Sequence, residues 1–276
     1  MSLTQINANI QALNSLGTLK SINNRLSVHQ TRLSTGKKIN STEEDPAGYA
    51  LATGLERRRR GLDVAIQNVS NAKNILNVAE GGYQNQLDIL QTIKEKATQA
   101  ADYSLSTAQR TAIHDQVTAL LNEIDAIEEE TTFNGNNLID GTYDGHFQTG
   151  EGADDNLHVT LTQSDSSSVG GTDVSGIDLT TANGASSAIS TVSNAIDDLA
   201  ESLQSIGEFK ARLSAKENTL SVASTNTEAI RSSVEDADYA KEQMEVMKLQ
   251  IMQQTAVSSF AQANASGQVV LSIVGG

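Results

Sequence analysis

The sequence predicts a mainly α fold: a long antiparallel coiled-coil helical bundle with paired terminal helices and a small β-rich tip. Apolar residues recur every seven positions over residues 46–102 and 184–231, which is typical of packed long helices. Five tyrosines, four phenylalanines, one proline and no tryptophan suit helices packed through Leu, Ile, Val and Ala. Residues 132–183, between the periodic segments, are rich in Gly, Asp, Ser and Thr, which favours turns and short strands.

The composition of the 276 residues argues against some classes of binding partner. A formal charge of −15 argues against nucleic acid or an anionic membrane as the main partner. The chain contains no cysteine, so disulfides and thiol chemistry are excluded. Its start lacks a basic region followed by an apolar stretch. We therefore expect no conventional signal peptide and, for an extracellular protein, export by another route.

Residues 3–35 form a predicted amphipathic helix with one narrow apolar stripe. Such a stripe cannot form a core alone, so the helix needs a partner. His29 falls on the stripe, and we interpret it as a packed seam residue rather than a pH sensor or a ligand. The stripe contains Ile6, Ile10, Leu13, Leu19, Ile22, Leu26 and Leu33.

Residues 36–45 are predicted to be a short connector between two helices. Gly36 is a helix stop, because glycine tolerates the left-handed geometry of a C-terminal cap. Asp45 is a predicted N-cap, and Pro46, the only proline, occupies the first helical position, where its missing N–H costs little.

The segment 46–102 carries a coiled-coil seam with small residues at one position, so that its partner helix can approach closely. A helix of this length would span roughly 80 Å, and Gly81-Gly82 are expected to bend or weaken it locally. Gln86 is the polar exception in the second row. The rows contain Leu55, Leu62, Val69, Leu76, Tyr83, Leu90 and Ala97, then Ala65, Ala72, Ala79, Ile93 and Ala100.

The basic run Arg57 to Arg60 resembles a targeting or nucleic-acid patch when taken alone. On a helix, however, four consecutive residues are spread around the circumference, about 100° apart. We therefore expect solvated side chains or pairing with acidic groups of neighbouring copies.

A third helix is predicted over residues 106–131, folding back on the long one. Its stripe contains Ile113, Val117, Leu120, Ile124 and Ile127. Asn134-Gly135 then signals a tight turn. Two short strands of a hairpin follow, over residues 146–149 and 157–161, and we place this loop-rich tip at the far end of the rod. His146 and His158 lie near acidic residues, but no recognised ligand spacing supports a metal site, so surface histidines are expected.

Residues 184–231 return along the bundle, with Leu199, Ile206 and Leu213 in their seven-residue row. Residues 234–275 form a last helix that is apolar over much of its surface. Its methionines suit either an irregular core or a surface that packs against more than one partner. Neither terminal helix is buried by the bundle, so we expect self-association. The apolar residues of the last helix are Met244, Met247, Ile251, Met252, Phe260, Val270, Leu271 and Ile273.

Nothing in the sequence predicts an enzyme. There is no HExxH motif and no phosphate loop, and the four histidines, which include His114, are scattered. The pair Asp197-Asp198 is expected to be solvated on a helix surface. We expect no catalytic residue, no cofactor and no bound metal.

Several motifs, in order, carry a family resemblance over nearly all of residues 1–140 and 184–276. The segments INANIQALNSL, RLSTGKKINSTEEDPAG, TTFNGNNLIDG, IGEFKARLSAKENTL and SSVEDADYAKEQMEVMKLQIMQQTAVSSFAQANASGQVVLSIV strongly resemble bacterial flagellin. A hook–filament junction protein, which has similar terminal helices, is the alternative. The closely matched rod and the EDADYA segment favour flagellin itself.

The resemblance implies a subunit that polymerises into the extracellular flagellar filament for motility. Residues 1–35 and 235–276 would form the filament's inner core, and residues 46–140 and 184–234 the outer tube. Residues 141–183 would be a short outward-facing tip. The family also implies unfolded export through the flagellar type III apparatus, an export chaperone at the C-terminal helix, and docking with hook-associated and cap proteins. Neither nucleic acid nor membrane is an expected partner.

Two departures from the family pattern affect these expectations. The family often has a proline after AQAN and closes on arginine, whereas this chain has Ala265-Ser266-Gly267 and ends in Gly275-Gly276. In flagellins sensed by Toll-like receptor 5, an innate immune receptor, the rod carries Gln-Arg-Val-Arg-Glu-Leu. Residues 91–96 here read Gln-Thr-Ile-Lys-Glu-Lys, so the resemblance predicts weak receptor recognition.

Overall fold

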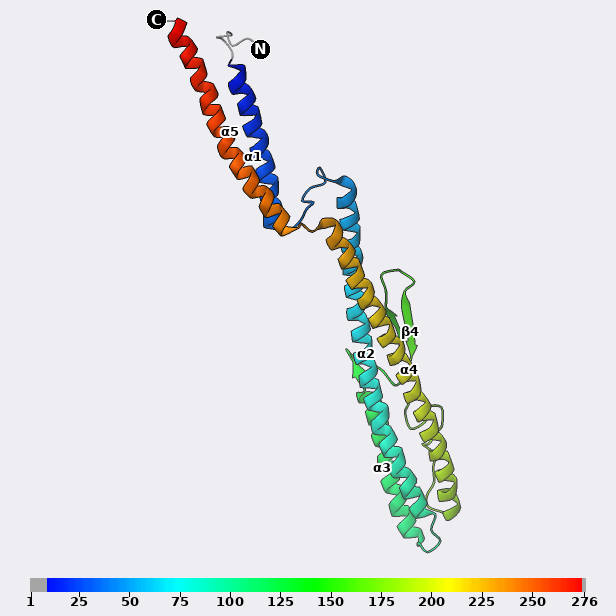
Figure 1. The fold of residues 1–276 in the computed structure, drawn as a ribbon. Coiled ribbons are helices and arrows are strands. Elements are labelled where there is room, and N and C mark those ends of the chain that lie inside the picture. Colours follow the sequence, from blue (N-terminus) through cyan, green and yellow to red (C-terminus); the bar gives the residue numbers. More distant parts are fainter. Residues whose placement is uncertain (1–8, 275–276) are drawn as a thin grey trace. The chain divides into compact units, whose positions relative to one another are not determined.

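The computed structural model describes residues 9–274, with side chains described as far as residue 265. Over these residues it contains the helices α1 (Ile10–Thr35), α2 (Pro46–Ala100), α3 (Thr107–Glu130), α4 (Ala182–Glu235) and α5 (Tyr239–Val274) (Figure 1). Two antiparallel strand pairs join β1 (Thr132–Phe133) to β2 (Asn136–Asn137) and β3 (Asp144–Gln148) to β4 (Asn156–Thr160). The predicted fold class, mainly α with a small β region, is confirmed.

The chain divides into two compact units. The terminal unit comprises Met1–Arg57 and Asn226–Gly276, and the rod unit comprises Arg58–Thr225. The terminal unit therefore includes the first turns of α2 and the last turns of α4 as well as α1 and α5. Within the described residues, no helix combines the length and the apolar character that crossing a membrane requires.

The helix boundaries follow from local chemistry at the positions that the sequence indicates. Gly36 ends α1 with a φ of 72°, and its N–H donates to the Arg32 carbonyl. Asp45 caps α2, because its Oδ1 accepts a hydrogen bond of 3.0 Å from the Gly48 N–H. Pro46 is the first residue of α2. The structure thus has a helix end at Gly36 and a helix start at Pro46, at the positions that the sequence indicates.

Two ion pairs show the register of α2 against α4 in the rod unit. Lys73 lies 3.0 Å from Glu217, and Glu80 lies 2.6 Å from Lys210. One step of seven residues along α2 thus corresponds to one step of seven back along α4. The two helices are antiparallel, and their seven-residue rows face each other along the rod.

The rod core consists of these apolar rows. Burying each large side chain contributes about 1.5–3 kcal/mol, and the alanines of the second row let the helices approach closely. Leu55 is half-buried, and Leu120 is partly buried against the core. The predicted rod residues that are buried are Leu62, Val69, Leu76, Leu90, Ile113, Val117, Leu199, Ile206 and Leu213.

Gln86, the polar exception in the α2 rows, is fully buried. Its Nε2 donates to the carbonyls of Ile124 (3.1 Å) and Ser164 (2.6 Å). Its Oε1 accepts a 2.5 Å hydrogen bond from the Ser164 hydroxyl. Because its amide is satisfied, Gln86 joins α2 to α3 and to the segment after β4 without an unpaired buried group.

Arg110 shapes the turn between α2 and α3, although the sequence did not single it out. Its buried guanidinium donates to the carbonyls of Ala100 (2.9 Å), Leu105 (2.8 Å) and Asp102 (2.6 Å). One side chain thereby satisfies three backbone carbonyl groups at the turn between α2 and α3. Ser106 then starts α3 through a capping box with Gln109.

The predicted turns and hairpin are present. Asn134 and Gly135 have φ values of 53° and 82°, which both positions of a tight two-residue hairpin turn require. The strands β3 and β4 pair antiparallel, with His146 opposite His158.

The hairpin does not lie at the far end of the rod, where we had placed it. Asn68, in the first turns of the rod unit, donates to the Gln148 carbonyl over 3.3 Å. Arg58 lies 2.9 Å from Glu151. The hairpin's position follows from the length of α3, which has 24 residues, whereas α2 has 55. Helix α3 therefore lies along only the second half of α2. Residues 131–148 then continue along α2 in the same direction. The arginine run thus forms intramolecular pairs, which include Arg59 with Asp63 at 2.7 Å.

The polar segment after the hairpin contains no helix or strand, as predicted, but it packs against the rod. We call residues 161–181 the return segment, because it runs from β4 back to the start of α4 (Figure 1). Val169, Val174 and Leu179 are fully buried in the rod core. The hydroxyl of Thr172 donates to Asp198 over 2.6 Å, so this carboxylate is bound within the rod and not merely solvated as predicted.

The Asp, Ser and Thr residues of the return segment form hydrogen bonds with near neighbours in the sequence. The carboxylate of Asp173 accepts hydrogen bonds from the hydroxyl and N–H of Ser175, and that of Asp178 does the same with Thr180. These bonds lower the pKa of both carboxyl groups. Such Asx turns bend the chain at each step, and they leave the intervening apolar residues to face the core.

Candidate assembly surface

The helices α1 and α5 pack against each other through a small apolar cluster. Ile22 and Leu26 of α1 and Val246 and Leu249 of α5 are buried there, with Leu33 and Ala256 packed at its edge. These few residues cover only one side of each helix. Several other apolar side chains of α1 and α5 are exposed among the described residues of the chain.

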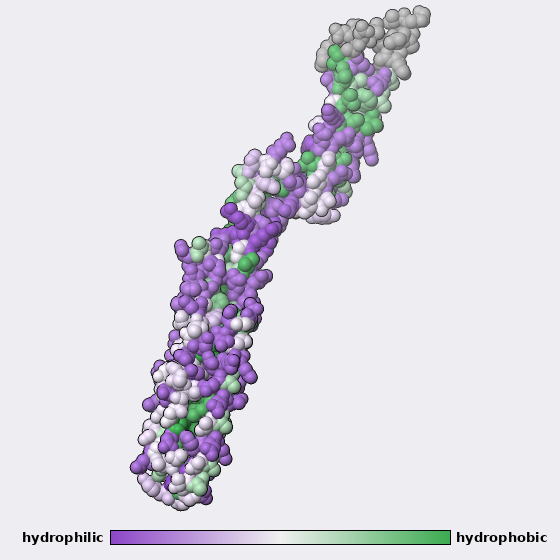
Figure 2. Space-filling view, turned by 180° about the vertical axis from the view of Figure 1, so that it is seen from behind, coloured by the Kyte–Doolittle hydropathy of each residue, from purple (hydrophilic) through white to green (hydrophobic). Residues whose placement is uncertain are grey.

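Six of the fifteen residues predicted for the self-association core are exposed at the surface of the described helices. Leu19 and Phe260 are half-buried. Ile6 lies outside the described residues, as do the side chains of Val270, Leu271 and Ile273. Figure 2 shows hydrophobic side chains at the surface of the terminal helices. The exposed members are Ile10 (50% exposed), Leu13 (60%), Met244 (60%), Met247 (48%), Ile251 (66%) and Met252 (38%).

A groove between α1 and α5 interrupts this surface. It encloses about 360 Å³, with Ser15 and Ile22 on one side and Ile251 and Met252 on the other. Hydroxyl groups line part of it. A side chain from another molecule could enter this groove without displacing a charged group.

The connectors at the ends of α1 and α4 form a two-stranded joint. Lys37 pairs with Asp236 in an isolated antiparallel bridge. The Lys38 N–H donates to the Glu235 carbonyl (2.6 Å), and the Ala237 N–H donates to the Gly36 carbonyl (2.9 Å). Both connectors are therefore held to each other by backbone hydrogen bonds.

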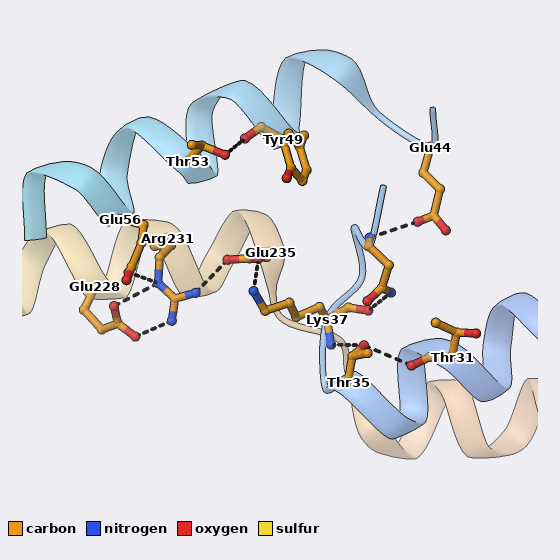
Figure 3. Close-up of polar contacts among 11 residues, drawn as sticks. Thr31, Thr35, Lys37, Glu44, Tyr49, Thr53, Glu56, Glu228, Arg231 and Glu235 are labelled. Carbon is orange, nitrogen blue, oxygen red and sulfur yellow. Dashed lines mark hydrogen bonds and ion pairs between the residues drawn. The ribbon is translucent and has the colours of Figure 1, made fainter. Parts of the chain in front are cut away.

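An ionic network extends this joint into the first turns of α2 (Figure 3). Lys37 lies 2.5 Å from one oxygen of Glu235, and Arg231 lies 2.6 Å from the other. Arg231 also binds Glu228 over 2.6 Å and lies 3.8 Å from Glu56.

The carboxyl group of Glu235 responds to two opposing influences. Burial raises its pKa, but the hydrogen bonds from Lys37 and Arg231 more than offset this effect, so the pKa of Glu235 lies below its ordinary value. The hydrogen bond to Glu228 is the main reason that the pKa of Arg231 is raised. Both shifts favour the charged forms of Glu235 and Arg231.

A second polar contact lies between α1 and α5. The His29 Nδ1 is 2.5 Å from the Glu242 carboxylate, which is itself buried. Arg32 lies 3.7 Å from Glu242 and 3.4 Å from Glu44. The structure therefore places His29 within the helix pair as a partner of an acidic side chain.

Sequence reasoning missed three of the contacts that hold the terminal helices. Val246 and Leu249, three positions apart, are the buried contacts of α5, and their spacing was a readable signal. The methionines at positions 244 and 247, which we had singled out, face away. Glu242 carried no local signal, because its partner is 213 positions distant in the sequence.

Comparisons with known families and proteins agree with this architecture. Residues 6–144 match the family described as the bacterial flagellin N-terminal helical region. Residues 189–274 match the family described as the bacterial flagellin C-terminal helical region. The two matched ranges lie on either side of residues 145–188.

Curated relatives extend over nearly the whole chain. Flagellin FlaB1 of Treponema pallidum is 31% identical over 283 residues, and the flagellin of Bacillus subtilis is 30% identical over 302 residues. Both alignments cover 98% of this chain and 99% of the relative.

Among solved structures, a putative flagellar hook-associated protein from Vibrio parahaemolyticus aligns with a TM-score of 0.59. The identity is 12%, and the alignment covers 70% of this chain and 100% of that protein. At this identity the likeness concerns the fold alone.

Proposed function

The chain belongs to the bacterial flagellin family, and from that premise we propose how its two units serve assembly. The protein is a structural subunit of the flagellar filament, the extracellular polymer that serves bacterial motility. We propose that residues 1–35 and 235–276 form the inner core of that filament. Residues 46–140 and 184–234 would form the outer tube, and residues 141–183 the outward-facing part.

The exposed apolar side chains of α1 and α5 are the observation that supports this proposal. Six of them are 38–66% exposed in the single chain. Fully burying an exposed side chain of this size contributes about 1.5–3 kcal/mol, and these six are about half exposed, so together they supply about 5–10 kcal/mol before the cost of association. In a helical polymer the same contact repeats at every subunit. Each subunit that joins the tip is therefore stabilised by the same burial of apolar side chains.

The joint at residues 36–45 and 236–238 has a mechanical role in this proposal. Its backbone hydrogen bonds and the Lys37–Glu235 pair hold both connectors together. A subunit with one free connector could turn its terminal helices independently of the rod. Two connectors joined to each other restrict that motion, so they would keep the inner and outer layers in register.

Further partners are inferred from membership of the family and not from contacts within this chain. We propose that an export chaperone covers α5 before assembly, because exposed methionines adapt to more than one partner surface. Hook-associated and cap proteins would meet the same terminal helices at the two ends of the filament. Export through the flagellar type III apparatus would deliver the chain to the outside.

Recognition by the innate receptor is proposed to be weak. Ile93, in the segment that replaces the family's receptor motif, is fully buried in the rod. Thr92 stands in place of the motif's first arginine and Lys96 in place of its leucine. Weak signalling by purified monomer in a reporter cell assay is the expected result, and potent signalling would contradict it.

Deletion of residues 235–276 tests the assembly role. We expect a soluble, largely helical rod, since its core lies in residues 58–225, that forms no polymer under electron microscopy. Normal filaments from the truncated protein would show that α5 is not part of the assembly core. Long self-polymerised filaments from the full chain, as opposed to short or absent assemblies, separate this function from that of a hook–filament junction protein.

A further inference from the structure

Three side chains of metal-ligand type share one face of the β3–β4 hairpin. His146 and His158 are directly opposite each other in the antiparallel register. Asp144 lies two residues before His146 on β3, and alternate residues of a strand point to the same side. Two imidazoles and one carboxylate therefore project together from a pair of strands.

Their donor atoms converge. One ligand atom from each of the three residues lies within 4.8 Å of the other two. The His146 Nε2 is 3.4 Å from Oδ1 of Asp144, and the His158 Nε2 contacts the same oxygen. The imidazole rings are stacked, with centroids 4.5 Å apart and an angle of 17° between their planes. Because Zn–N and Zn–O bonds are about 2.0–2.2 Å, side-chain rotations alone can bring the three atoms around one ion.

The opposite face of the hairpin holds this arrangement in place. Leu157 and Val159, which alternate with His158 along β4, are buried in the rod core. The Gln148 carbonyl at the end of β3 accepts a hydrogen bond from Asn68 of α2. A one-residue slip in register would expose both apolar side chains, so the register and the ligand face are fixed by packing.

We propose that Asp144, His146 and His158 bind one divalent transition-metal ion of the Zn²⁺ class. Imidazole nitrogens favour Zn²⁺, Ni²⁺ and Cu²⁺ over Mg²⁺ and Ca²⁺, which prefer oxygen ligands. The three side chains are 51–62% exposed, so an ion can reach them from solvent. The negative charge of the chain raises the local concentration of cations.

Bound Zn²⁺ would replace the contact between His158 and Asp144 and would cross-link the two strands. Water would complete the coordination shell on the solvent side. Because the ion binds the paired strands and not the open hairpin, it would stabilise the hairpin as its concentration rises. The effect is local to the rod unit and independent of polymerisation.

Calorimetric titration of the full-length monomer with Zn²⁺ tests the site. We expect saturable binding of one ion per chain, weakened by about tenfold or more in His146→Gln and in His158→Gln. The matched control His114→Gln, which alters a histidine of α3, should bind as the wild type does. Amide hydrogen exchange should show added protection of β3 and β4 with Zn²⁺, and circular dichroism should confirm that every variant keeps its helices.

Three results would overturn the proposal. The first is no saturable binding of Zn²⁺ by the wild type. The second is binding that both hairpin variants retain unchanged, because the ion would then lie elsewhere. The third is equal binding of Mg²⁺, which would indicate carboxylates rather than imidazoles as the ligands.

Discussion

Lys37 and Glu235 are 198 positions apart in the sequence, yet the Lys37 ammonium lies 2.5 Å from the Glu235 carboxylate. The pair closes a joint whose two connectors already exchange backbone hydrogen bonds. Arg231 contacts the second oxygen of the same carboxylate. One acidic side chain at the end of α4 thus ties the connector that follows α1 to α4.

Acid should weaken this joint. The pKa of Glu235 in the folded chain is below its ordinary value of 4.5. A carboxyl group of this kind contributes stability above its unfolded pKa, and that contribution is lost as pH falls through the folded pKa. We expect no change between neutral pH and about pH 5, and progressive loss below about pH 4. A carbon-13 titration of the Glu235 carboxyl group measures this directly.

The variant Lys37→Met should raise the pKa of Glu235, because a hydrogen bond to the carboxylate is removed while its burial remains. Lys248→Met is the matched control, since Lys248 pairs with Glu245 over 3.4 Å on an exposed surface of α5. An identical Glu235 titration in Lys37→Met and wild type would show that the ion pair is not formed in solution.

Adjacent glycines of α2 should respond in opposite ways to the same substitution. A Cβ at Gly82 would lie 2.7 Å from the Thr131 Oγ1, whereas a Cβ at Gly81 would meet nothing within 4 Å. Gly82→Ala should therefore cost about 1–3 kcal/mol through overpacking. Gly81→Ala should stabilise the helix by about 0.5–1 kcal/mol. Urea unfolding of the monomer gives both values, and the same sign for the two variants would contradict the packing of α2 against the end of α3.

Removing the buried Gln86 amide should lower the free energy of unfolding. Removing the Ser164 hydroxyl together with it should lower this free energy by less. Gln86→Leu leaves the Ser164 hydroxyl and two carbonyls without their donor or acceptor, so we expect a loss of about 2–4 kcal/mol. In Gln86→Leu combined with Ser164→Ala, part of this loss should be recovered, because one unpaired group is gone. A double-mutant cycle from urea unfolding measures the coupling, and strictly additive losses would argue against the hydrogen bonds between these residues.

Local chemistry made much of the fold predictable from sequence. The cap residues Gly36 and Asp45 and the turn at Asn134-Gly135 act through their own backbone geometry, so their effect is readable without knowledge of distant residues. The seven-residue rows of α2 and α4 are similarly explicit, because the period in α2 continues from Leu55 to Ala97, over more than 40 positions. These features define helices, boundaries and the antiparallel rod.

Contacts between distant residues were the part that the sequence did not reveal. Val169, Val174 and Leu179 are isolated apolar residues in a polar segment. They are buried because the segment packs against the rod, which no local pattern predicts. The position of the β3–β4 hairpin depends on the length of α3 relative to α2. His29 was identified as a seam residue, but its acidic partner Glu242 became apparent only when α1 and α5 were side by side.

Seeded filament growth tests the assembly role of the α5 surface most directly. Ile251→Ser removes an apolar side chain that is 66% exposed, and Tyr103→Ser, at a rod position that is 80% exposed, is its control. Electron microscopy and sedimentation of seeded mixtures give the critical concentration of each monomer. We predict that Ile251→Ser keeps the wild-type circular dichroism and raises the critical concentration by about fivefold or more, because about 1–2 kcal/mol of the burial gained on assembly is lost. Elongation of Ile251→Ser at the wild-type critical concentration would contradict the assignment of this surface to assembly.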